Sequence, residues 1–71
     1  MRYAIVIERG EISYGAYVPD LPGCVAVGDT REEALALIRD AIELHIEDLR
    51  DRGGVVPLPS SESAFIETQA A

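Results

Sequence analysis

The sequence predicts an α+β fold with the element order β-β-β-α-β, in which one helix packs on one face of a small antiparallel or mixed sheet. Three observations favour this fold. Apolar side chains alternate with a period of two before residue 28, as in strands. A helix-capping pattern at Thr30 then precedes a long stretch of helical periodicity. A β-branched and aromatic segment lies near the end of the chain. With 71 residues, we expect a single domain over residues 1–71.

The first two predicted strands form an antiparallel hairpin. Residues 3–8 are the first strand, because Tyr3, Ile5 and Ile7 recur at every second position. Gly10 allows a tight reversal, and extended character resumes over residues 12–18.

Two prolines and Gly23 interrupt the chain over residues 19–23, so we expect a turn there. A short apolar run over residues 24–27 is long enough for a third strand beside the hairpin. Its direction is left open by propensity alone.

A helix is predicted over residues 31–52. The Thr30 hydroxyl can accept from the Glu33 amide while the Glu33 carboxylate reaches the Thr30 amide, which defines the start. Glycine after the helix accepts a left-handed conformation, so Gly53 marks the end. Successive 100° rotations gather the apolar side chains on one side of this helix: Ala34, Leu35, Ile38, Ala41, Ile42, His45, Ile46 and Leu49.

A connector punctuated by Pro57 and Pro59 follows the helix. Residues 63–68 then combine β-branched and aromatic side chains, which favours a fourth strand. The last three residues are expected to fray.

Composition favours a soluble protein that associates with other chains. Thirteen acidic and six basic residues give a net charge of −7, which repels nucleic acid and favours a basic partner, although acidity also serves solubility.

With one cysteine, Cys24, and one histidine, the chain has no intrachain disulfide and no zinc cluster. Small hydrophobic cores are usually stabilised by disulfides, a metal or self-association, and here only self-association is available. We therefore expect a homo-oligomer, a dimer at least. We expect neither a cofactor nor a metal.

The first residues lead directly into a short apolar strand, without a signal-peptide h-region or an apolar stretch of membrane-spanning length. We therefore expect a cytoplasmic protein that does not enter a membrane.

Catalytic interpretations of individual residues are weaker than structural ones. A two-metal nuclease needs converging carboxylates, and the first strand offers only Glu8. His45 falls on the apolar side of the helix, where a structural role at the edge of the core outweighs that of a general base. No lysine or neighbouring histidine activates Cys24, which favours a buried apolar thiol.

The remaining candidates are serines and tyrosines. The serines near residue 60 lack the strand-turn-helix elbow of a nucleophile and are interpreted as linker residues. Tyr3, Tyr14 and Tyr17 could stack nucleic-acid bases, but the basic groove that such binding needs is missing, so cross-strand packing explains them better. We expect the protein not to be an enzyme.

Two segments in order carry a family likeness: PDLPGC at residues 19–24, and GDTREEA at residues 28–34. With the preceding strand and the Pro57-Leu58-Pro59 connector, they resemble the N-terminal domain of HicB-like antitoxins over nearly the whole chain. The resemblance implies a partial RNase H-like fold. Many such antitoxins carry a C-terminal DNA-binding segment. None follows residue 67 here, so direct nucleic-acid binding is not expected.

The resemblance implies an antitoxin-like module that binds and blocks a basic RNA-cleaving toxin of the HicA type. The alternative is a stand-alone oligomeric domain of the same fold, binding a small ligand or serving a structural role without a toxin. For the first hypothesis, five carboxylates are the predicted partner-binding residues: Asp20, Asp29, Glu32, Glu43 and Glu47.

Overall fold

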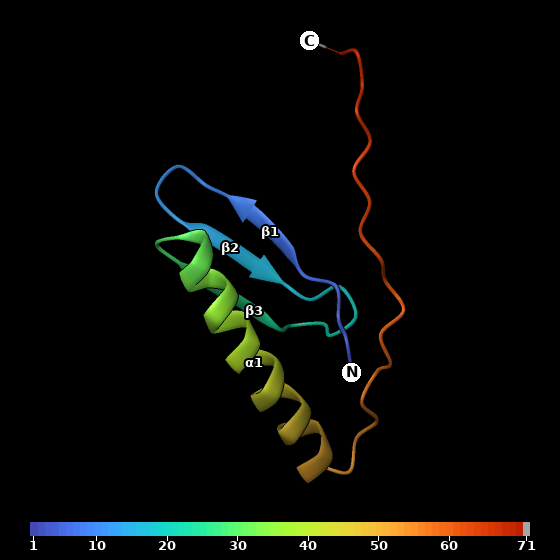
Figure 1. Ribbon diagram of the computed structural model, residues 1–71. Coiled ribbons are helices and arrows are strands. Elements are labelled where there is room, and N and C mark those ends of the chain that lie inside the picture. The colour runs from blue at the N-terminus through green and yellow to red at the C-terminus, as the bar shows by residue number, and fades with distance from the viewer. Residues whose placement is uncertain (71) are drawn as a thin grey trace.

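One long helix lies across one face of a three-stranded sheet in the computed structural model, which describes residues 1–70 (Figure 1). The strands are β1 (Val6–Arg9), β2 (Tyr14–Tyr17) and β3 (Val25–Gly28), and the helix is α1 (Arg31–Asp51). The sheet order is β1-β2-β3, and both strand pairs are antiparallel. The α+β class and the first four elements of the predicted order are thereby confirmed, and the direction of the third strand is settled.

The core lies between α1 and the inner face of the sheet. The register places Ala16 opposite Ile7 on one side and Ala26 on the other, and all three contribute to the apolar cluster. α1 packs against β3 and, less extensively, against β2. The predicted apolar stripe of the helix faces this layer, with Ala34 and Ile38 fully buried. The buried core residues are Ala16, Val18, Leu21, Cys24, Ala34 and Ile38.

The predicted turn between β2 and β3 also closes the core. The Val18 amide donates to the Cys24 carbonyl, and the Cys24 amide donates to the Leu21 carbonyl at 3.0 Å. Gly23 has φ of +84°, a left-handed conformation that glycine adopts without steric cost. The turn buries Leu21 completely. A segment that sequence patterns describe only as a break in the sheet therefore supplies a core side chain.

α1 begins against the end of β3. A Cβ atom on Gly28 would lie 2.7 Å from the Ala34 amide nitrogen, so only glycine allows this close approach. The Thr30 hydroxyl accepts from the Glu33 amide at 3.0 Å, as predicted, whereas the Glu33 carboxylate accepts from the Asp29 amide rather than from that of Thr30. The helix ends at Asp51, and Gly53, with φ of +71°, follows in the expected left-handed conformation.

The prediction of a fourth strand over residues 63–68 is wrong. Residues 62–70, here called the tail, contain no helix or strand, and Phe65 is 100% exposed and Ile66 86% exposed. Figure 1 shows the tail leaving the sheet instead of joining it. A segment with high strand propensity still forms a strand only where the edge of a neighbouring strand accepts its backbone hydrogen bonds.

The first two strands are shorter than predicted for a related reason. β2 ends at Tyr17, because the Val18 amide is already bonded within the following turn. β1 therefore starts at Val6, opposite Tyr17, and residues 3–5 have no strand beside them on that side.

Candidate functional site

Asp20 holds the connector that follows the helix. Its carboxylate accepts four hydrogen bonds, from the amide and hydroxyl of Ser60 at 2.8 and 3.2 Å and from those of Ser61 at 2.9 and 2.7 Å. These bonds lower the pKa of Asp20 from 3.8 to about 2, and the largest contribution comes from the Ser61 amide. Asp20 therefore stays ionised, with both carboxylate oxygens already occupied by its own chain.

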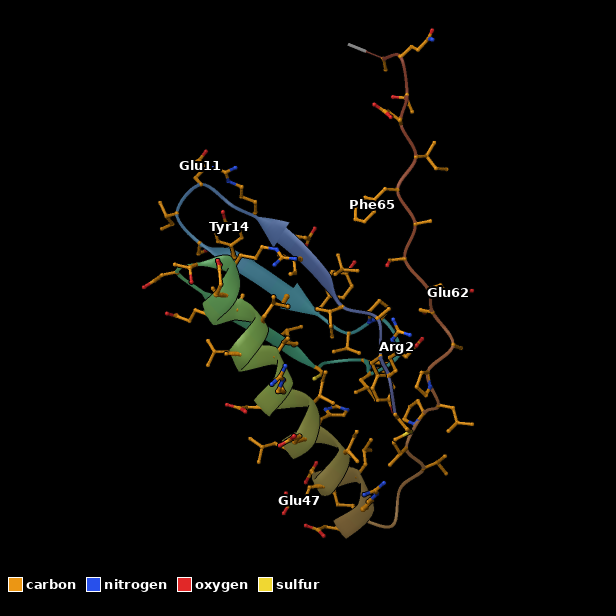
Figure 2. The ribbon with its side chains drawn as sticks, viewed as in Figure 1. Arg2, Glu11, Tyr14, Glu47, Glu62 and Phe65 are labelled. Carbon is orange, nitrogen blue, oxygen red and sulfur yellow. The ribbon has the colours of Figure 1, made fainter. Side chains whose placement is uncertain are left out.

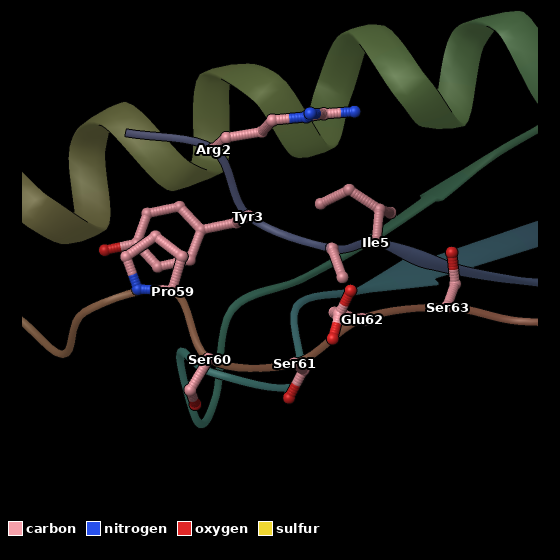
Figure 3. Close-up of a pocket in the computed structure, with 9 residues that line it drawn as sticks. Arg2, Tyr3, Ile5, Pro59, Ser60, Ser61, Glu62 and Ser63 are labelled. Atoms are coloured by element: carbon pink, nitrogen blue, oxygen red, sulfur yellow. The ribbon is translucent and has the colours of Figure 1, made fainter.

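A second contact holds the connector beside the N-terminal segment. The Tyr3 hydroxyl donates to the carbonyl of Pro57. Beyond it, residues 2–5 on one side and residues 59–63 on the other line a cleft of about 700 Å³ (Figure 3). The connector thus lies alongside the N-terminal segment without pairing with it through backbone hydrogen bonds in the described part of the chain.

The other four predicted partner-binding residues all lie along α1 or just before it, and all are exposed. Asp29 and Glu32 lie at the helix start. Glu43 is eleven residues after Glu32, close to three helical turns, so the two share one face. Glu47, labelled in Figure 2, continues this face one turn later. The structure brings Glu43 and Glu47 together but separates them from Asp29 and Glu32 by roughly 16 Å of helix, at about 1.5 Å per residue.

The exposed face of α1 combines negative charge with apolar side chains. The helix carries seven acidic and three basic residues, a net charge of −4. Two exposed leucines lie between these charged side chains. Leu37 is 41% exposed and Leu44 is 66% exposed, and because they are seven residues apart they lie on one line along the helix. Near its C-terminal end, Glu43 and Glu47 help to line an open depression of about 440 Å³. Such a surface suits contact with a basic protein that has an apolar patch.

The structural interpretations of the candidate catalytic residues agree with their positions. Cys24 is buried, and burial raises the pKa of its thiol. His45 is half-buried on the core side of α1, and Glu8 is exposed on β1. Within residues 1–70, no three His, Cys, Asp or Glu side chains come close enough to hold a metal ion. Over the same residues, no helix has the length and apolar character to span a bilayer.

The tyrosines and serines have structural contacts of their own. Tyr3 and Tyr14 pack against the core, while Tyr17 is on the outer face of the sheet, opposite Val6 and Val25. Sequence reasoning missed the bonds of Ser60 and Ser61 to Asp20. These partners are 40 and 41 residues apart, and no local pattern connects them.

Comparisons with known proteins identify relatives over nearly the whole chain. Residues 3–70 match the family model described as the HicB-like antitoxin of bacterial toxin-antitoxin systems. Antitoxin HicB 2 of Photorhabdus laumondii is 38% identical over 76 aligned positions, covering 100% of this chain and 52% of that protein. A UPF0150 protein of Thermoplasma acidophilum is 38% identical, with 93% of this chain and 97% of that protein covered.

A third relative is an uncharacterised 14.9 kDa protein of Haemophilus phage HP1, 40% identical over 93% of this chain and 50% of its own length. The chain therefore spans about half the length of two of these relatives and nearly the whole length of the Thermoplasma protein.

Proposed function

This chain belongs to the HicB-like antitoxin family of bacterial toxin-antitoxin systems, and on that premise we propose that it binds and blocks a small basic RNA-cleaving toxin of the HicA type. The observation that carries the proposal is the exposed acidic face of α1, with Leu37 and Leu44 in its midst. A protein that cleaves RNA needs a basic surface to hold phosphates, and a carboxylate-bearing face competes for that surface.

Each group on the surface has a distinct role in the proposed contact. Leu37 and Leu44 supply apolar area that is lost from water when a partner covers the helix. Glu32, Glu43 and Glu47, with Asp29 at the helix start, steer the basic partner toward it. Asp20 adds to the field only at long range, because its oxygens are engaged by Ser60 and Ser61.

Inhibition in this proposal is steric, and the chain performs no chemistry. It needs neither a metal nor a cofactor, and it contacts the toxin rather than RNA. A toxin that acts on cellular RNA also places the pair in the cytoplasm.

The proposal is tested with a basic HicA-like protein encoded beside this chain. We expect calorimetry at low salt to show saturable binding, and stopped-flow association to slow as salt screens the charges over a Debye length of about 8–10 Å. The double variant Glu43→Lys with Glu47→Lys should associate roughly tenfold more slowly while keeping its helical circular dichroism.

The matched control is Glu8→Lys with Glu11→Lys, which changes the charge equally at exposed positions outside α1. Its association rate should stay within about threefold of the parent, since only the overall field changes. Equal slowing by both pairs would assign the effect to net charge and refute the helix surface. Absence of heat and of co-elution at low salt would refute toxin binding itself.

The alternative function is a stand-alone oligomeric domain with a small ligand or a structural role. The feature in its favour is the cleft between residues 2–5 and 59–63, which has a volume in the range of small-molecule sites. A chain that binds no neighbouring basic protein but is stabilised by a small molecule would support this alternative.

A further inference from the structure

We propose that residues 63–68 form a strand on the β1 edge of a second copy of this chain, so that two copies exchange their tails. The juxtaposition that carries the proposal lies within one molecule: an open sheet edge and an extended apolar segment that belongs to no sheet.

β1 offers the open edge. In the sheet that residues 1–70 form, β1 neighbours only β2, so its other side presents unpaired backbone amides and carbonyls. The helix packs over β3 and β2, and Ile5 and Ile7 are only partly buried as a result. An added strand on this edge would satisfy the backbone groups and extend the apolar layer past β1.

The tail has the properties of a strand without a partner. Its central residues, Ala64-Phe65-Ile66, have β-branched and aromatic character, yet Phe65 is fully exposed. No backbone hydrogen bond joins the tail to the sheet within residues 1–70. Figure 2 shows Phe65 on the tail, apart from the helix and sheet. Strand formation elsewhere would remove this apolar area from water.

The connector explains why a second copy, rather than the same molecule, receives the tail. Asp20 and Tyr3 hold Ser60, Ser61 and Pro57 in place, and the cleft separates the chain after Pro59 from residues 2–5 (Figure 3). Beyond Glu62 the tail continues past the sheet and does not follow its own β1 (Figure 1). Pairing with a second copy leaves all these bonds intact, and a two-fold exchange satisfies both tails and both edges at once.

Charge selects β1 over the other open edge. Arg2 precedes β1 and Arg9 is its last residue, so with Glu8 the residues 2–9 carry a net charge of +1, whereas Asp29 follows β3 directly. The tail carries Glu62 and Glu67 and has no basic residue. Opposite charges on neighbouring strands favour pairing and like charges oppose it, so the acidic tail fits β1 better than β3.

The first test is the solution mass of the full chain by sedimentation equilibrium over a micromolar concentration series. We expect twice the chain mass of 7.7 kDa. The double variant Phe65→Ser with Ile66→Ser should weaken dimerisation by roughly tenfold or more, because it removes most of the apolar area of the added strand. Both side chains are exposed and lie outside α1, so the helical circular dichroism should be unchanged.

The matched control is Val55→Ser with Leu58→Ser, which removes two exposed apolar side chains from the connector upstream of the tail. This variant should dimerise like the parent. A second comparison, Val25→Ser with Val27→Ser, changes the exposed outer face of the sheet. If only that pair abolished the dimer, the copies would associate through their outer sheet faces and the tail exchange would be wrong.

The second test separates exchange between copies from folding back within one copy. Phe65 is replaced by p-benzoylphenylalanine, and ¹⁴N- and ¹⁵N-labelled chains are mixed, irradiated and digested with trypsin, which releases β1 within the peptide Tyr3–Arg9. We expect cross-links from the tail to this peptide that join the two isotopes. Single-isotope cross-links alone would show that the tail pairs with its own edge, and a monomeric mass would also overturn the proposal. Neither test involves a toxin, so failure here leaves the proposed function to its own experiment.

Discussion

The carboxylate of Asp20 bonds both the amide and the hydroxyl of Ser61, a residue 41 positions later in the chain. The contact links the turn after β2 to the connector after α1. It therefore determines where the tail leaves the folded part of the molecule, although neither residue belongs to a helix or strand.

We predict that this contact weakens in acid. The pKa of Asp20 is about 2 in the folded chain against 3.8 for the free side chain, so its stabilising contribution is complete above about pH 4. It is lost as the pH falls from there through about 2, because the protonated carboxyl accepts hydrogen bonds poorly. The amide chemical shifts of Ser60 and Ser61 should titrate together in this range. In Asp20→Asn they should not, and titration in that variant would assign the shifts to another group.

Gly28→Ala should destabilise the fold by about 1–3 kcal/mol, because the added methyl would collide with the start of α1. Urea unfolding followed by circular dichroism measures the change. The control is Gly15→Ala on β2, where nothing lies within 4 Å of the added atom. That variant should stay within roughly 1 kcal/mol of the parent. Equal losses at both glycines would contradict the close packing of β3 against the helix.

Ile38→Ala should cost about 2–5 kcal/mol of unfolding free energy, since the side chain is 2% exposed and its removal leaves a cavity. Ile38→Asp should prevent folding by burying an unpaired charge. Leu44→Ala on the opposite face should change stability by no more than about 0.5 kcal/mol. A large loss of stability at Leu44 in the isolated chain would show that this face is already covered by another copy.

Cys24 should react slowly with iodoacetamide in the native state at pH 8. It is 3% exposed and burial raises the pKa of the thiol, so both access and thiolate content are low. Mass spectrometry after timed quenching measures the labelled fraction. Labelling in urea supplies the control, where the same thiol should react fully. Equally fast labelling with and without urea would mean that the turn carrying Cys24 opens readily.

Local sequence determined the elements whose causes are local. The packing of Ile5 and Ile7 on the core, the glycine at position 23 and the Thr30 hydroxyl cap are each explained within a few residues, and these features agree with the structure. The other half of the predicted capping box does not, because Glu33 bonds the Asp29 amide, and the first strand begins at Val6 instead of residue 3. The helical face ending at Leu49 could be predicted for the same reason, because a 3.6-residue period repeats without reference to the rest of the chain.

Only the tertiary structure decided the features that depend on distant partners. The bonds of Asp20 to Ser60 and Ser61 join two loops, and the burial of Leu21 depends on how the helix covers the sheet. The expected strand over residues 63–68 had the right side chains, but a strand exists only where a neighbouring edge accepts its backbone hydrogen bonds. The strand propensity of the side chains can be predicted from the sequence, whereas the position of the accepting sheet edge depends on how the helix and strands pack together.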